Sequence, residues 1–206
     1  MIFFSDYLES ADRKGDDELL VVEKNQVIWF CLSDGAGGTG NGSVASRFIV
    51  DSFKAVMSSD EFKSPDNFET FLRKIDKALF QSNLASEATV IVGKIENNVV
   101  MGASVGDSQA WFYASNYTYQ LTSLQYRRPL LGSGRCVAVG FGPLELQRYL
   151  LIGSDGLFNY CQQKTLRAVL ANKKVKAESV AKCVERFGGK LNDDLSVILI
   201  ERESAN

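Results

Sequence analysis

Residues 26–40, QVIWFCLSDGAGGTG, join an apolar run to a glycine-rich loop. The apolar part reads as a strand, and five glycines then occupy eight positions from Gly35 to Gly42. One carboxylate, Asp34, stands between the strand and the glycines. The loop either cradles the phosphates of a nucleotide or serves to present Asp34. These alternatives predict different proteins, and the rest of the chain distinguishes them.

The composition predicts one soluble domain. With 206 residues the chain is long enough for a substantial core, so we expect a single domain over residues 1–206. A net charge of −2 gives no basic excess for nucleic acid. No apolar stretch approaches the roughly 20 residues of a membrane span, and the start, MIFFSDYLES, lacks the features of a signal peptide. Four widely spaced cysteines favour a reduced, cytoplasmic protein, which we expect to be a monomer.

The chain contains no histidine. Ser-His-Asp and Cys-His catalysis are therefore excluded, as are zinc sites built on imidazole. Acid–base chemistry and metal binding must depend mainly on carboxylates. Oxygen ligands favour hard ions such as Mg²⁺ and Mn²⁺.

The order of predicted elements favours an α+β layered sandwich over alternating βαβ units. Strands and helices are predicted from apolar periodicity, with Pro65 and a capping residue at the start of the second helix. The predicted strands are 19–23, 26–33, 88–96, 99–106, 109–115, 117–123, 148–154 and 194–202. The predicted helices are 43–59, 64–83, 166–172 and 177–188, with a further turn into a helix after Asp155.

The nucleotide-binding alternatives are weak. GAGGTG (residues 35–40) satisfies the dinucleotide pattern G-x-G-x-x-G, and Asp60 lies at a suitable distance downstream. However, Asp60 lies in SSDEFKS, which has no strand character, and the later chain lacks βα alternation. A Walker loop is excluded because Asn41, and not lysine, follows Gly40.

Five acidic turns adjoin predicted strands. Each alone is an ordinary role for aspartate, but two of them share the sequence Ser-Asp-Gly. They contain Asp16 and Asp17, Asp34, Asp107, Asp155, and Asp193 and Asp194. Because one aspartate does not bind a metal alone, the pattern predicts that carboxylates from several strand ends share one site.

The segments RKGDDELLV, SDGAGG, GDSQA, GSDGLFNY and NDDLSVILI, in this order, resemble the metal-dependent type 2C serine/threonine phosphatases. The resemblance runs through most of the chain. It implies a four-layer α-β-β-α sandwich, in which two antiparallel sheets are flanked by helices. It also implies a binuclear Mn²⁺ or Mg²⁺ centre at one end, with a weaker third metal in some members.

The resemblance assigns metal ligands by position. Asp34 resembles the aspartate that bridges both ions, and Gly35 the glycine whose carbonyl binds one of them. Asp155 resembles the ligand of the SDG motif, and Asp193 that of the final segment. Asp17 fits the aspartate of the family's N-E-D box.

The acidic box departs from the family pattern. It reads GDD, and not NED, so Asp16 and Glu18 remain alternatives to Asp17. Arg13 resembles the phosphate-binding arginine, although it lies one residue closer to the box than is usual.

The third metal site also departs from the family. Asp107 resembles the aspartate of GDSR, which is associated with the third metal, but Gln109 replaces the arginine of that motif. Asn159 stands where an aspartate often supports the third metal, and Ala36 where some members carry a histidine. The stretch from Asp107 to Asp155 is short, so we expect the substrate-facing flap of larger relatives to be reduced.

The resemblance implies hydrolysis of phosphoserine or phosphothreonine in a protein by a water that two metal ions activate. An opposing Ser/Thr kinase is the implied partner. The alternative is a metal-poor pseudophosphatase that binds a phosphoprotein or a kinase. A second phosphatase chemistry rests on Cys161 and Arg167, spaced as C-x5-R. It is less favoured because the intervening residues contain no glycine for an anion-binding loop.

Overall fold

A computed structural model describes residues 1–12, 14–37, 41–84, 86–114, 116–172 and 174–203. The strands are β1 (Ile2–Glu9), β2 (Glu18–Lys24), β3 (Val27–Ser33), β4 (Val90–Glu96), β5 (Val99–Val105), β6 (Gln109–Tyr113), β7 (Thr118–Gln120), β8 (Val139–Glu145), β9 (Tyr149–Gly153) and β10 (Leu195–Arg202). The helices are α1 (Gly42–Val56), α2 (Pro65–Gln81), α3 (Asp155–Phe158), α4 (Gln163–Leu170) and α5 (Ala177–Ala181).

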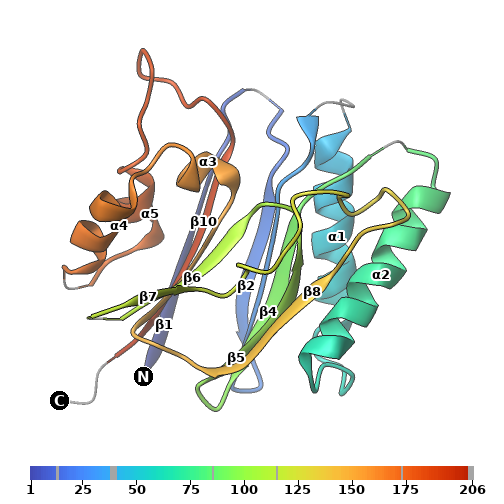
Figure 1. Cartoon of the computed structure of the whole chain (residues 1–206), viewed down its shortest axis with the longest axis horizontal. Helices are drawn as coiled ribbons and strands as arrows, with labels where there is room; N and C mark the ends of the chain where they lie inside the picture. The colour runs from blue at the N-terminus through green and yellow to red at the C-terminus, as the bar shows by residue number, and fades with distance from the viewer. Residues whose placement is uncertain (13, 38–40, 85, 115, 173, 204–206) are drawn as a thin grey trace.

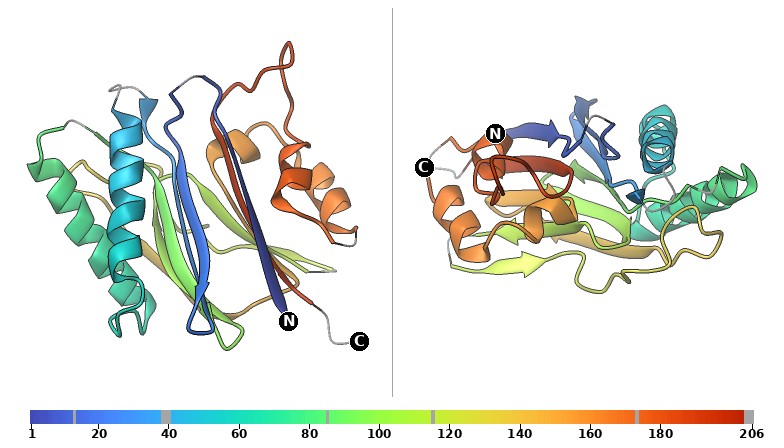
Figure 2. Two further views of the ribbon diagram at one scale, coloured as in Figure 1. Left: turned by 180° about the vertical axis from the view of Figure 1, so that it is seen from behind. Right: turned by 90° about the horizontal axis from the view of Figure 1, so that it is seen from above.

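The strands form two five-stranded sheets, in the orders β1-β10-β9-β6-β7 and β2-β3-β4-β5-β8. Every pairing between neighbouring strands is antiparallel. Helices α1 and α2 cover the outer face of the second sheet, and α3, α4 and α5 lie against the first (Figures 1 and 2). The predicted four-layer α-β-β-α sandwich is therefore confirmed.

Strand β3 is apolar throughout because both of its faces are covered. Since side chains alternate across a strand, Val27, Trp29 and Cys31 pack under helices α1 and α2. Ile28, Phe30 and Leu32 point the other way, into the core between the sheets. The run VIWFCL therefore lies in the middle of the sandwich, with no residue above 8% exposure.

Strand β10 repeats this arrangement in the other sheet. Val197 and Leu199 pack under the helices of that side, and Ile198 and Ile200 face the opposite sheet. Three separate apolar layers thus hold the sandwich together, one between the sheets and one beneath each group of helices.

Two strands were not predicted from the sequence. Strand β1 is an edge strand that pairs only with β10, and Phe3 and Phe4 remain 49% and 37% exposed. Strand β8 contains Gly140, Gly142 and Pro143, residues typical of loops. The last predicted helix is shorter than expected, since α5 ends at Ala181. In the part of the chain that the structure describes, no helix combines the length and the apolar character needed to cross a membrane.

The strand register brings the predicted acidic turns to one end of the sandwich. Glu18, the first residue of β2, pairs with Ser33, the last residue of β3. Gly153, at the end of β9, pairs with Val197 near the start of β10. The segments that contain Asp17, Asp34, Asp155 and Asp193 therefore lie together at the upper end in Figure 1.

Candidate metal centre

Close backbone contacts between glycines position the loops of this acidic end. A Cβ atom on Gly35 would approach the carbonyl carbon of Gly42 to 2.4 Å, so the end of β3 lies directly against the start of α1. A Cβ on Gly156 would lie 2.0 Å from the carbonyl oxygen of Asp194. The glycines after Asp34 and Asp155 therefore permit contacts that no other residue allows.

The Asp34 backbone is fixed by Thr89 on the neighbouring chain segment. The amide of Thr89 donates to the Asp34 carbonyl at 2.8 Å, and the amide of Asp34 donates to Thr89 Oγ1 at 3.3 Å. Burial raises the pKa of the Asp34 carboxyl, and the charges of Asp17, Asp155, Asp193 and Asp107 raise it further. The negative charges of the other four aspartates therefore all disfavour ionisation of Asp34.

Asp17 is a buried carboxylate that accepts no hydrogen bond of normal geometry from the described residues. Its residue is only 8% exposed, and both carboxylate oxygens are buried with no hydrogen-bond partner among the described residues. Burial raises the pKa of Asp17, and the charge of Asp194 adds to this, although the nearby Ser196 hydroxyl opposes it. A buried anion of this kind is costly unless a cation neutralises it.

Asp16, the first alternative to Asp17, is already engaged by the backbone. Its Oδ1 accepts from the amide of Ser43 at 3.0 Å, in the first turn of α1. Its carbonyl accepts from the amide of Gly35 at 3.1 Å and from the hydroxyl of Ser46. Asp16 therefore joins the start of β2 to α1 and to the end of β3.

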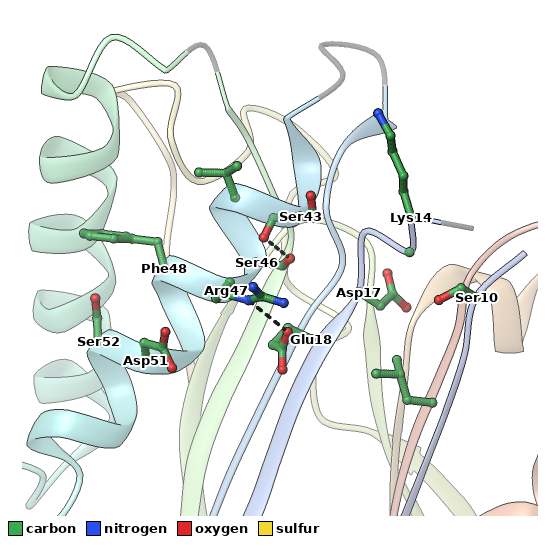
Figure 3. Close-up of a pocket in the computed structure, with 13 residues that line it drawn as sticks. Ser10, Lys14, Asp17, Glu18, Ser43, Ser46, Arg47, Phe48, Asp51 and Ser52 are labelled. Atoms are coloured by element: carbon green, nitrogen blue, oxygen red, sulfur yellow. Dashed lines mark hydrogen bonds and ion pairs between the residues drawn. The ribbon is translucent and has the colours of Figure 1, made fainter. Parts of the chain in front are cut away.

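Glu18, the second alternative, points away from Asp17. Its Oε2 lies 3.8 Å from Nε of Arg47 on α1, and the two side chains of Asp17 and Glu18 diverge (Figure 3). Alternation along the strand explains this, because consecutive side chains lie on opposite faces.

Asp194 is also structural. Its Oδ1 accepts from the amide of Ala11 at 2.7 Å, and its Oδ2 accepts from the amide of Asp16. The carboxylate thereby ties the turn between β1 and β2 to the start of β10. Asp193, its neighbour, accepts from the amide of Asp194 at 3.0 Å, and burial raises the pKa of its carboxyl.

Asp155 and Asp107 accept hydrogen bonds from other side chains. The Asn159 amide donates to Asp155 Oδ2 at 3.1 Å, and Arg127 Nε donates to Asp107 Oδ2 at 2.8 Å. Burial raises the pKa of Asp155, and the charges of Asp193 and Asp107 add to the effect, whereas the charge of Arg127 opposes it.

The residues present suit hard divalent cations. Among the described residues, no three acidic or cysteine side chains lie close enough together to enclose a metal ion. The unpaired oxygens of Asp17 and the raised pKa of Asp34 nevertheless show an excess of negative charge that a cation would relieve. Carboxylate and carbonyl oxygens are the donors that Mg²⁺ and Mn²⁺ prefer.

By sequence the chain matches no protein family and no curated protein, but several solved structures share its fold. A bacterial serine phosphatase is 20% identical, with a TM-score of 0.84 and full coverage of both chains. This chain has the fold of the bacterial serine/threonine phosphatases. Stp1 from Staphylococcus aureus is 19% identical, with a TM-score of 0.81 and coverage of 99% of this chain and 96% of that one. The Mycobacterium tuberculosis phosphatase PstP/Ppp is 18% identical, with a TM-score of 0.76 and coverage of 98% and 99%.

Two cationic residues beside the acidic end of this phosphatase fold were not singled out from the sequence. Lys14 and Arg47 line a cavity of about 800 Å³ between the β1–β2 turn and α1, together with Asp17, Val44 and Phe48 (Figure 3). Arg47 and Phe48 lie three and four residues after Val44 on α1, a spacing that could have indicated that each shares a face with Val44. The predicted phosphate-binding residue, Arg13, lies outside the described residues.

The structure argues against the two alternative sites, the cysteine-based phosphatase motif and the dinucleotide-binding loop. Cys161 is 5% exposed, and burial raises the pKa of its thiol to about 12, so it is not a thiolate at neutral pH. Arg167 donates to Thr118 Oγ1 at 2.8 Å and is engaged elsewhere. Asp60 lies in a turn after α1, and the sheets are antiparallel, which removes the parallel βαβ context of a dinucleotide site.

Proposed function

We propose that this chain hydrolyses phosphoserine or phosphothreonine in proteins with the help of two Mn²⁺ or Mg²⁺ ions. The observation that carries the proposal is Asp17, a buried carboxylate with both oxygens unpaired, whose charge acts on Asp34. The phosphatase fold supports the same reaction class. A buried anionic cluster of this kind is otherwise unfavourable for folding.

The residues that would hold the ions are Asp17, Asp34, Asp155 and Asp193, with the carbonyl of Gly35. Divalent ions supply an activated water at neutral pH and neutralise charge on the phosphoryl oxygens. Asp16 and Asp194 keep the ligands in place through backbone hydrogen bonds. Glu18 is excluded from the ligand set in this proposal because it faces Arg47.

The basic side chains beside the cluster would attract the phosphorylated substrate. Lys14 and Arg47 lie in the cavity that also contains Asp17, so a phosphate dianion bound there meets positive charge next to the ions. Arg13 remains our proposed direct phosphate ligand, since a guanidinium forms paired hydrogen bonds with phosphate oxygens. The substrate would be a protein phosphorylated by an opposing kinase, and the phosphatase would act as a cytoplasmic monomer.

Phosphate release from a phosphoserine peptide tests the proposal. We expect activity with Mn²⁺, loss of activity in EDTA, and a decrease of at least 100-fold for Asp34→Asn. Activity that persists in EDTA would exclude the mechanism. Calorimetric titration with Mn²⁺ distinguishes the alternative, since a pseudophosphatase that only binds phosphoproteins should take up fewer than two ions.

A further inference from the structure

Arg127 provides a protein cation at the carboxylate that was expected to bind a third metal. Its Nε lies 2.8 Å from Oδ2 of Asp107, in hydrogen-bonding geometry. A guanidinium keeps its positive charge at all accessible pH values. The Asp107 carboxylate therefore already has a permanent counter-charge from the protein.

The loop that carries Arg127 is tied to the sheets on both sides of this residue. Gln125 Nε2 donates to the carbonyl of Ser108 at 2.6 Å, directly beside Asp107. On the other side, the backbones of Leu131 and Ala88 exchange hydrogen bonds of 3.0 and 3.1 Å. These contacts hold the loop near Asp107, although the Arg127 side chain itself is 79% exposed.

Two positions near Asp107 also differ from the family pattern. Asn159 directs an amide N–H to Asp155 Oδ2 at 3.1 Å, where an aspartate would direct an oxygen towards a cation. The Gln109 oxygen accepts from the indole N–H of Trp111 at 2.8 Å and is therefore engaged as well.

We propose that the Arg127 guanidinium stands in for the third cation, so that the centre takes up two divalent ions and no third. This inference rests on the proposed function. A third ion at Asp107 would compete with Arg127 for the carboxylate and would remain close to the positive charge of the guanidinium. It would also meet the Asn159 amide, which offers donors on the nitrogen that faces Asp155. The Arg127 guanidinium and the Asn159 amide therefore both favour a centre of two ions.

Mn²⁺ stoichiometry, measured by calorimetry on the metal-free full-length chain, tests this inference. We expect two ions for the unaltered protein and three, the third weaker, for the double variant Arg127→Ala/Asn159→Asp. The matched control is Arg128→Ala/Asn159→Asp, which removes the adjacent exposed arginine and should keep two ions. Far-UV circular dichroism on all three proteins checks that each is folded.

The outcomes separate this inference from the function itself. Three ions in the unaltered protein, with one lost in Asp107→Asn, would overturn the role of Arg127 and leave the phosphatase proposal intact. A double variant that still binds two ions would also overturn it. Fewer than two ions in the unaltered protein would instead overturn the proposed function.

Discussion

Gly156 lies directly against the backbone of Asp194, so that a Cβ atom at position 156 would approach the Asp194 carbonyl oxygen to 2.0 Å. This contact stacks α3, which carries Asp155, on the segment that carries Asp193. Two carboxylates far apart in the sequence thereby become neighbours through a glycine that itself binds nothing.

The variant Gly156→Ala should therefore separate Asp155 from Asp193. The added methyl meets backbone atoms, which have little freedom to yield, so we expect destabilisation by about 1–3 kcal/mol and a loss of Mn²⁺ affinity. Thermal unfolding and calorimetric titration measure the two effects. Gly37→Ala is the control, because its nearest neighbour would be Asp16 Oδ2 at an ordinary 3.6 Å. Equal behaviour of the two variants would contradict the packing role of Gly156.

The adjacent residues Asp16 and Asp17 should respond to mutation with opposite signs. Asp16→Ala removes an acceptor from the first turn of α1 and should lower the stability of the metal-free protein by about 1 kcal/mol. Asp17→Asn removes an unpaired buried charge and should raise that stability by a similar amount, while Mn²⁺ binding is lost. Denaturant unfolding in EDTA gives the sign of each change. If Asp17→Asn destabilised the metal-free protein, its carboxylate would have a structural partner.

The sequence predicted the strand ends that carry Asp34, Asp155 and Asp193 because each lies in a local pattern, an apolar run next to an acidic turn. The choice among Asp16, Asp17 and Glu18 could not be predicted in this way. It depends on Ser43 and Arg47, which belong to a helix more than 20 residues away. Only the folded chain shows which of the three carboxylates is left without a partner.

Strand β1 and the ion pair between Asp107 and Arg127 were also not predicted, because local sequence patterns do not show them. Strand β1 lies at a sheet edge, where exposed Phe3 and Phe4 obscure the alternation that marks a half-buried strand. The pair between Asp107 and Arg127 joins residues 20 positions apart, with strands β6 and β7 between them in the sequence. No local sequence pattern marks Arg127 as a partner of Asp107, because the loop that carries it is held by the contacts of Gln125 and Leu131.

The stability of the metal-free protein should fall as the pH rises from 5 to 8. Burial raises the folded-state pKa of Asp34 and of Asp17 above the unfolded value of about 4. The folded state therefore binds protons more tightly than the unfolded state, and protonation stabilises it. This stabilisation is fully present below the unfolded pKa and is lost as the pH rises and the carboxyls of the folded protein ionise. Melting temperatures in EDTA measure the trend. Saturating Mn²⁺ should reverse it, because the cation binds the ionised form, and a flat profile in EDTA would contradict the burial of these carboxyls.

Charge reversal at Arg47 should lower the catalytic efficiency with phosphopeptides. Arg47 is 73% exposed in its side chain and pairs with Glu18 only at 3.8 Å, so its charge is available to a substrate in the cavity beside Asp17. Arg47→Glu should lower kcat/KM for a phosphoserine peptide by about tenfold at low salt, since an unscreened charge acts over roughly 10 Å. The effect should shrink in 0.5 M NaCl.

Lys164→Glu is the matched control for Arg47→Glu, because Lys164 is an exposed cation on α4, in the layer on the opposite side of the sandwich. It makes the same change in net charge far from the acidic end. If both variants lowered kcat/KM equally, the effect would come from the overall charge. A decrease confined to Arg47→Glu, and removed by salt, would show that the phosphorylated substrate approaches the acidic end past α1.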